Sequence, residues 1–202
     1  MSPSISIHLL WPLSDALMEW PRQPRPMERF AVKRGVMKSI GGNAGLIEVA
    51  GRYFDDVRPD TTGGFTGSKA ILSVVCGHFD EKGRLVVDTE QMRGEDLRAF
   101  LGQDGGRDAA MAARGAWSSF LDEVTGYTPK QRGDKAKEAA KKMSKSRSAV
   151  KLARNFMEKV DLPQERRAVV EDLIAQVEEQ IEANEETRAF SLSEKLNAAL
   201  ES

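Results

Sequence analysis

The stretch from Gly126 to Gln131 constrains the fold most, because it ends one helix and starts another. Gly126 is typical of the residue that follows a helix, where the backbone turns into the left-handed region. Thr128 is a suitable N-cap, Pro129 suits the first helical position, and Gln131 completes a capping box. The sequence therefore predicts a helix up to Gly126, a sharp corner, and a second helix that begins at Pro129.

The segments on the two sides of this corner differ in character. Before it, apolar residues recur at helical spacing, which is typical of a helix packed on a core. After it, residues 130–154 contain ten Lys and Arg against two acids, about +8 in all. Residues 158–202 then contain five Lys and Arg against twelve acids, about −7. The net charge of −1 for the whole chain hides this polarity, which permits either internal neutralisation or two different partners.

The N-terminal half has the pattern of an α+β domain. Residues 29–34 and 84–89 alternate like half-buried strands, and residues 69–79 are apolar and β-branched. Asp80 to Gly83 is a turn that joins the last two into a hairpin. Asn43 is a candidate N-cap for a helix that follows it. The segments 55–60 and 61–67 look like a link and a turn. We therefore predict a small, mostly antiparallel sheet of three to four strands, packed by two helices, over residues 28–126.

The rest of the chain is predicted to be helical. A basic helix over residues 128–148 is expected to weaken around its serines, which compete for backbone hydrogen bonds. An acidic helical hairpin follows within residues 149–202, with Asp161 and Ser191 as expected N-caps. Its apolar seam is close to a heptad pattern and consists of Val170, Leu173, Val177 and Ile181.

The N-terminus and the single cysteine bear on location. Residues 1–27 are predicted to be a disordered leader, because prolines interrupt them and no basic flank precedes their apolar patch. Cys76 is the only cysteine, which excludes an internal disulfide and suits a reducing compartment. No run approaches the roughly 20 apolar residues of a membrane span. We therefore expect a cytoplasmic protein.

The sequence from Phe120 to Arg132, followed by Lys135-Ala136-Lys137, resembles the signature of a family of unknown function, domain-of-unknown-function family 5611. Members similarly begin with a strand that ends in Lys-Arg-Gly, here Lys33 to Gly35. The resemblance covers roughly residues 28–142. It implies an archaeal, cytoplasmic α+β protein that starts near Met27, and it transfers no catalytic residue.

Three small constellations suggest chemistry, and each has a structural explanation. Cys76 and His78 share one face of a strand, but neighbours two apart lie about 6–7 Å apart at the backbone, which is loose for a nucleophile and its base. The aspartates of residues 55–60 suit magnesium or an ordinary turn. The Gly-x-x-Gly at residues 42–45 suits a phosphate contact or a turn and helix cap. We predict no catalytic site, no metal and no cofactor.

The basic segment carries the functional hypothesis. Its charge density suits contacts with phosphates, but it lacks interleaved aromatic residues, so any RNA or DNA binding should be weakly selective. The candidate residues are Lys130, Arg132, Lys135, Lys137, Lys141, Lys142, Lys145 and Arg147. We expect a non-enzymatic accessory protein that contacts nucleic acid. The alternative is protein–protein interaction or homo-oligomerisation through the seam. The sequence leaves open whether the acidic tail neutralises the basic helix.

Overall fold

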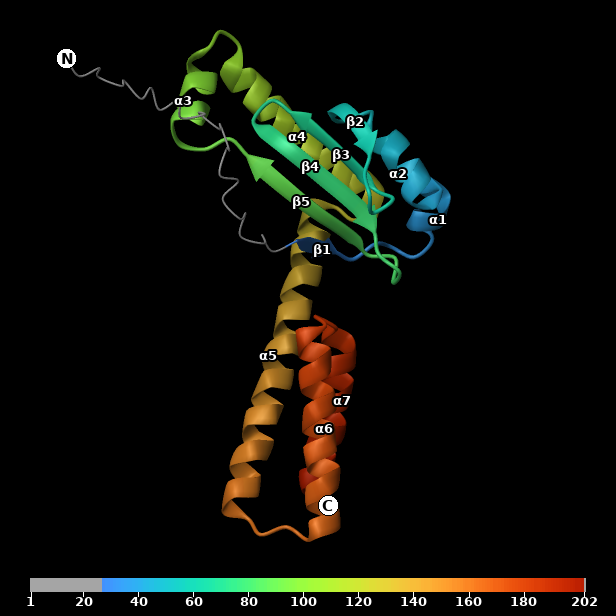
Figure 1. Ribbon diagram of the computed structural model, residues 1–202, viewed down its shortest axis with the longest axis vertical. Coiled ribbons are helices and arrows are strands. Elements are labelled where there is room, and N and C mark those ends of the chain that lie inside the picture. The colour runs from blue at the N-terminus through green and yellow to red at the C-terminus, as the bar shows by residue number, and fades with distance from the viewer. Residues whose placement is uncertain (1–26, 202) are drawn as a thin grey trace, which may run out of the picture.

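The computed structural model describes residues 27–201 of the chain. The leader expected at residues 1–27 therefore lies, apart from Met27, outside the described residues. The predicted α+β class is confirmed. An α+β domain is followed by three long helices, α5 to α7, which run beside one another and which we call the stalk (Figure 1).

The sheet has five strands, all paired antiparallel, in the order β1-β5-β4-β3-β2. Their bounds are β1 Glu28–Phe30, β2 Asp55–Pro59, β3 Phe65–Lys69, β4 Leu72–Phe79 and β5 Leu85–Gln91. The predicted hairpin is confirmed as β4 and β5. Asp80 accepts hydrogen bonds from the backbone N–H groups of Lys82 and Arg84, which fixes the turn between the two strands.

The strand count exceeds the prediction because the segments taken as a link and a turn are strands. β2 is an irregular edge strand: its register with β3 shifts between Asp55 and Arg58, and Asp56 has a positive φ. Charged residues, a bulge and a proline are common on such edges. The predicted strand over residues 69–79 is in fact divided at Ala70, whose φ of 47° reverses the chain between β3 and β4.

Helices cover one face of the sheet, and Figure 1 looks onto the opposite face. The helices of the domain are α1 Val36–Ile40, α2 Gly42–Ala50, α3 Gly94–Gly102 and α4 Gly106–Thr125. The predicted stripe on α4 is confirmed as core, with Phe120 fully buried. Its ring lies 5.0 Å from that of Phe54 and 5.4 Å from that of Phe65, centroid to centroid. This aromatic cluster joins α4 to the sheet.

Asn43 does not cap a helix as predicted; Gly41 occupies the N-cap position of α2. The Asn43 side chain instead pairs with the backbone of Phe79: its Oδ1 accepts from the Phe79 N–H at 2.6 Å, and its amide donates to the Phe79 carbonyl at 3.3 Å. Asn43 therefore fastens α2 to the end of β4.

Helix α5, Pro129–Lys159, is one continuous helix of 31 residues. The predicted boundary between residues 148 and 149 falls inside it, and the expected weakening at the serines does not occur. Ser146 and Ser148 donate to the carbonyls of Lys142 and Ser144, four residues earlier, so their hydroxyls bond within the helix. At 1.5 Å per residue, α5 is about 46 Å long.

The C-terminal helices are α6 Gln164–Glu182 and α7 Glu186–Glu201, which confirms the predicted hairpin. The expected caps were wrong. The N-cap of α6 is Pro163, and Ser191 lies inside α7, which begins after a turn at Asn184 with φ of 56°. The seam packs inside the stalk against α5 and α7: Val170 and Val177 are fully buried, and Leu173 and Ile181 are half-buried.

Candidate nucleic-acid interface

The corner between α4 and α5 is built as the sequence predicts. Gly126 has φ of 70°, and Thr128 and Gln131 form a complete capping box. Arg132 adds a clamp that was not foreseen. Its guanidinium pairs with Asp122 of α4 and donates to the Tyr127 carbonyl at 2.6 Å, and its side chain is only 9% exposed. Arg132 therefore holds the corner, and its charge is already paired.

Four lysines lie along the solvent-facing side of α5. Lys130, Lys137, Lys141 and Lys151 are exposed, and none of them has an ion-pair partner within residues 27–201. At about 100° of rotation per residue they fall within about 80° of one another, over a length of about 32 Å. We call these four residues the lysine stripe.

The remaining predicted cations lie beside or behind the stripe. Lys135 and Lys142 both pair with Glu138, at 3.5 Å and 3.1 Å. Lys145 lies over the Phe190 ring of α7, 5.4 Å from its centroid. Arg147 faces a pocket on the other side of the helix. The predicted set is thus divided: three of its eight members, Lys130, Lys137 and Lys141, belong to the stripe, and Lys151 joins them.

The acidic tail does little to neutralise the basic helix. Among the ion pairs of the described residues, Arg154 with Glu178 is the one that joins a cation of α5 to a carboxylate of α6 or α7, at 2.8 Å. This pair lies near the middle of the stalk. The four lysines of the stripe consequently keep their positive charges exposed, although the neighbouring helices α6 and α7 are acidic.

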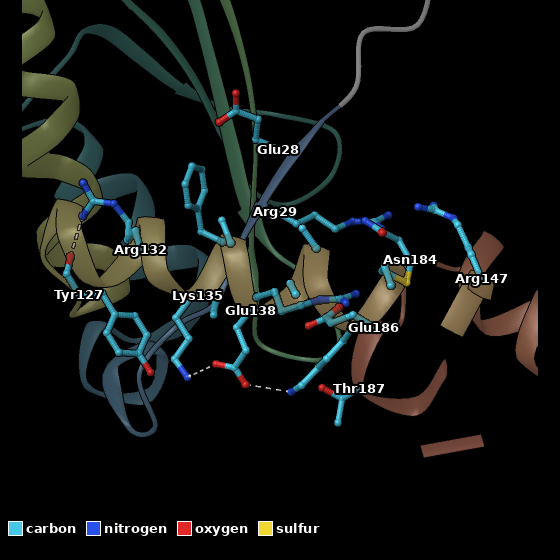
Figure 2. A pocket seen from close by; sticks show the side chains of 18 residues that line it. Glu28, Arg29, Tyr127, Arg132, Lys135, Glu138, Arg147, Asn184, Glu186 and Thr187 are labelled. Carbon is cyan, nitrogen blue, oxygen red and sulfur yellow. Dashed lines mark hydrogen bonds and ion pairs between the residues drawn. The ribbon is translucent and has the colours of Figure 1, made fainter. Parts of the chain in front are cut away.

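A cavity of about 710 Å³ lies behind the stripe, where the α+β domain meets the stalk. β1, the first half of α5 and the turn between α6 and α7 form its walls (Figure 2). We call it the rear pocket. Six Lys or Arg and three Glu line it. Sequence reasoning missed Arg29 and Arg84 as members of a site, because no local motif marks them and they come from separate strands.

An ionic cluster fastens the stalk to the sheet beside this pocket. Glu185, in the turn before α7, accepts from Lys82 at 2.6 Å and from Arg84 at 3.0 Å, and Arg84 also binds Asp80 at 2.8 Å. We call Lys82, Arg84 and Glu185 the latch. Burial by itself would raise the pKa of the Glu185 carboxyl, but the hydrogen bond from Lys82 and the charges of Arg84 and Lys82 outweigh it and hold this pKa below its usual value.

The latch predicts a dependence of stability on pH. Because the folded pKa of Glu185 is depressed, its contribution is complete above the unfolded pKa of about 4.3 and is lost as the pH falls through the folded pKa. Glu185→Gln should lower the free energy of unfolding by about 1–2 kcal/mol at pH 7, and much less at pH 3. Urea unfolding at both pH values measures this difference. Glu182→Gln, on an exposed residue of α6, is the control and should change neither.

The other constellations have structural roles. The Cys76 thiol donates to the Thr66 hydroxyl at 3.4 Å, across the strands. Asp60 accepts from the backbone N–H groups of Thr62 and Gly64, as expected of a turn aspartate. No group of three or more His, Cys, Asp or Glu within the described residues could hold a metal ion. None of the described helices is both long and apolar enough to cross a bilayer.

Comparison with protein families decides the affiliation. The family described as Domain of unknown function (DUF5611) matches residues 27–138, more than half of the chain. The chain belongs to this family. The resemblance seen at the corner is therefore confirmed. The DUF5611 match comprises the α+β domain, the corner and the first turns of α5 as far as Glu138. It therefore includes Lys130 and Lys137 of the stripe. No curated protein and no solved structure matched the chain.

Proposed function

We propose that this DUF5611 protein is a non-catalytic accessory protein that contacts RNA or DNA weakly, and without strong sequence preference, through the lysine stripe. The observation that supports this most directly is the row of four exposed lysines on one side of α5 with no carboxylate partner among the described residues. The ammonium groups of such a row can replace the counterions that surround a phosphate backbone.

The expected selectivity follows from the composition of the stripe. Lysine presents a mobile point charge, whereas base recognition relies on planar or bidentate groups such as those of Arg, Asn and Gln. No aromatic side chain lies between the four lysines on which an unpaired base could stack. Contacts should therefore go to phosphates, so affinity should depend on salt far more than on sequence.

Reversing two charges of the stripe should abolish this binding. With four phosphate contacts, affinity for duplex DNA should fall by about two orders of magnitude between 50 and 200 mM salt. Lys137→Glu combined with Lys141→Glu should reduce affinity at 50 mM salt at least tenfold and flatten the salt dependence. Fluorescence anisotropy with labelled single-stranded RNA and duplex DNA measures both. Lys142 is unsuitable for this test, because it pairs with Glu138 and is partly buried.

The matched control is Arg188→Glu combined with Lys195→Glu. Both residues are exposed on α7, and the change in net charge is the same. If binding depends on the stripe, this control should retain most of the affinity. Equal loss in the two double variants would show that only the overall charge matters, and no binding at low salt would remove the proposal.

The alternative role, self-association through the C-terminal helices, now has less support. The seam residues Val170 and Val177 are buried within the chain's own stalk. Single exposed apolar residues such as Leu152 and Val169 remain, and isolated residues of this kind are normal on a surface. A sedimentation experiment over a range of protein concentrations separates the two roles, because only self-association makes the apparent mass depend on concentration.

A further inference from the structure

Two arginines in the rear pocket have no carboxylate partner among the residues that the structure describes. Arg29 of β1 and Arg147 of α5 line this pocket and form no ion pair within residues 27–201. Their guanidinium groups extend toward the same end of the pocket from different elements (Figure 2). The other four cations of the pocket, Arg84, Arg132, Lys135 and Lys142, are already paired.

Two like charges that share the end of a cavity repel each other, and an anion between them would relieve that repulsion. A guanidinium presents its N–H donors in a planar fork, which matches the oxygens of a phosphate and can form two parallel hydrogen bonds. The pair comes from two segments that are far apart in the sequence, so one helix face alone does not create it. A doubly charged phosphate monoester suits this end of the pocket.

The remaining wall suits an apolar or planar body. Phe30, Ala136, Ala139 and Met143 line the pocket, and Tyr127 lines it at the corner. Its volume of about 710 Å³ falls within the roughly 300–1,000 Å³ typical of small-molecule sites, which often lie between structural units, as this one does.

Two of the three acids of the pocket, Glu138 and Glu28, do not oppose an anion at the arginine end. Glu138 is occupied by Lys135 and Lys142. Glu28 extends away from the other labelled side chains in Figure 2. Glu186 is the first residue of α7 and forms no ion pair within residues 27–201, so its carboxylate is available to accept from ligand hydroxyls.

We propose that the rear pocket binds a small phosphate monoester with a planar or apolar body, with nucleoside monophosphates as the best-matching class. Arg29 and Arg147 hold the phosphate, and the wall from Phe30 to Met143 receives the body. The proposal is independent of the lysine stripe. Around α5, Arg147 lies about 80° from Lys137 and about 120° from Lys141, the two lysines changed in the stripe variant, and about 40° from Lys151.

Titration calorimetry with AMP, adenosine and inorganic phosphate tests the proposal. AMP should bind saturably at one site per chain, at least tenfold more tightly than adenosine or inorganic phosphate, because each of these lacks half of the recognised features. Arg29→Gln combined with Arg147→Gln should weaken AMP binding at least tenfold. Both arginines are exposed, so this variant should keep the fold, which circular dichroism verifies.

Two matched variants make the result specific. Arg58→Gln combined with Arg98→Gln removes two exposed arginines that neither line the pocket nor neighbour its lining residues in the sequence, and should leave AMP affinity unchanged. Lys137→Glu combined with Lys141→Glu should also retain AMP binding, whatever it does to nucleic acid. No AMP binding, equal affinity for AMP and adenosine, or an unaltered Arg29/Arg147 variant would overturn the proposal. Tighter binding of a 5′-phosphorylated oligonucleotide through the same two arginines would overturn the small-ligand assignment.

Discussion

Replacing Phe120 by alanine is expected to lower the free energy of unfolding of the α+β domain by about 3–5 kcal/mol. Phe120 is fully buried, and its ring contacts those of Tyr53, Phe54, Phe65 and Trp117 at centroid distances of 5.0 to 6.1 Å. The loss includes the transfer free energy of the ring and a cavity that four surrounding rings cannot readily collapse into. For a domain stabilised by about 5–15 kcal/mol, this is a large fraction.

Urea unfolding followed by circular dichroism measures the change. Met111→Ala is the control, because Met111 lies on the same helix and is 66% exposed, so its replacement should change stability by no more than about 0.5 kcal/mol. Hydrogen exchange adds a spatial check. The core of the α+β domain and the core of the stalk share no residues. Amides of α6 and α7 should therefore lose less protection from exchange than those of β4. A small effect of Phe120→Ala would mean that the aromatic cluster is not the main core.

Sequence reasoning succeeded where local chemistry decides the structure. The corner depends on Gly126, Thr128 and Gln131, all within six positions, and the hairpin turn depends on Asp80 and Gly83. It failed where tertiary packing overrides local preference. Ser146 and Ser148 donate to carbonyls of their own helix, and Ser146 is fully buried among the residues that face α6 and α7, so the helix continues.

The missed strands have a different cause. β2 carries two aspartates and a proline, and β3 contains Gly67, so neither has the apolar alternation of a strand. β3 forms because β4 offers it a partner, and β2 pairs with β3, where the glycine permits close approach: a Cβ on Gly67 would lie 3.0 Å from Val57 Cγ2. Pairing with a neighbouring strand cannot be read from composition alone.

The candidate sites show the same division. The stripe could be expected from charge density, although the pattern could not say which cations are paired; Arg132 is held by Asp122, and Lys135 and Lys142 by Glu138. The rear pocket could not be expected, since Arg29, Arg147 and Asn184 come together only when the stalk folds back beside β1. Charge in a sequence indicates a possible partner, whereas the geometry of unpaired charges indicates where that partner binds.

Replacing Gly45 by alanine is the second change with a large expected effect, and it bears on the Gly-x-x-Gly segment at residues 42–45. A Cβ at Gly45 would lie 1.7 Å from the Ile40 carbonyl oxygen, a backbone atom that cannot move without separating α1 from α2. Relief of such overpacking typically costs 1–3 kcal/mol and sometimes more, so we expect a loss of about 3 kcal/mol in the free energy of unfolding.

Gly115→Ala is the matched control, because the chemical change is the same and the expected sign is opposite. Gly115 lies within α4, is exposed, and has no atom within 4 Å of an added Cβ. Alanine there should stabilise the helix by about 0.5–1 kcal/mol. If both variants were instead as stable as the native chain, the close approach of Gly45 to Ile40 would not explain the glycine. The phosphate-contact interpretation of residues 42–45, the first turn of α2, would then regain its force, because a turn that tolerates a side chain has room for a ligand at its N–H groups.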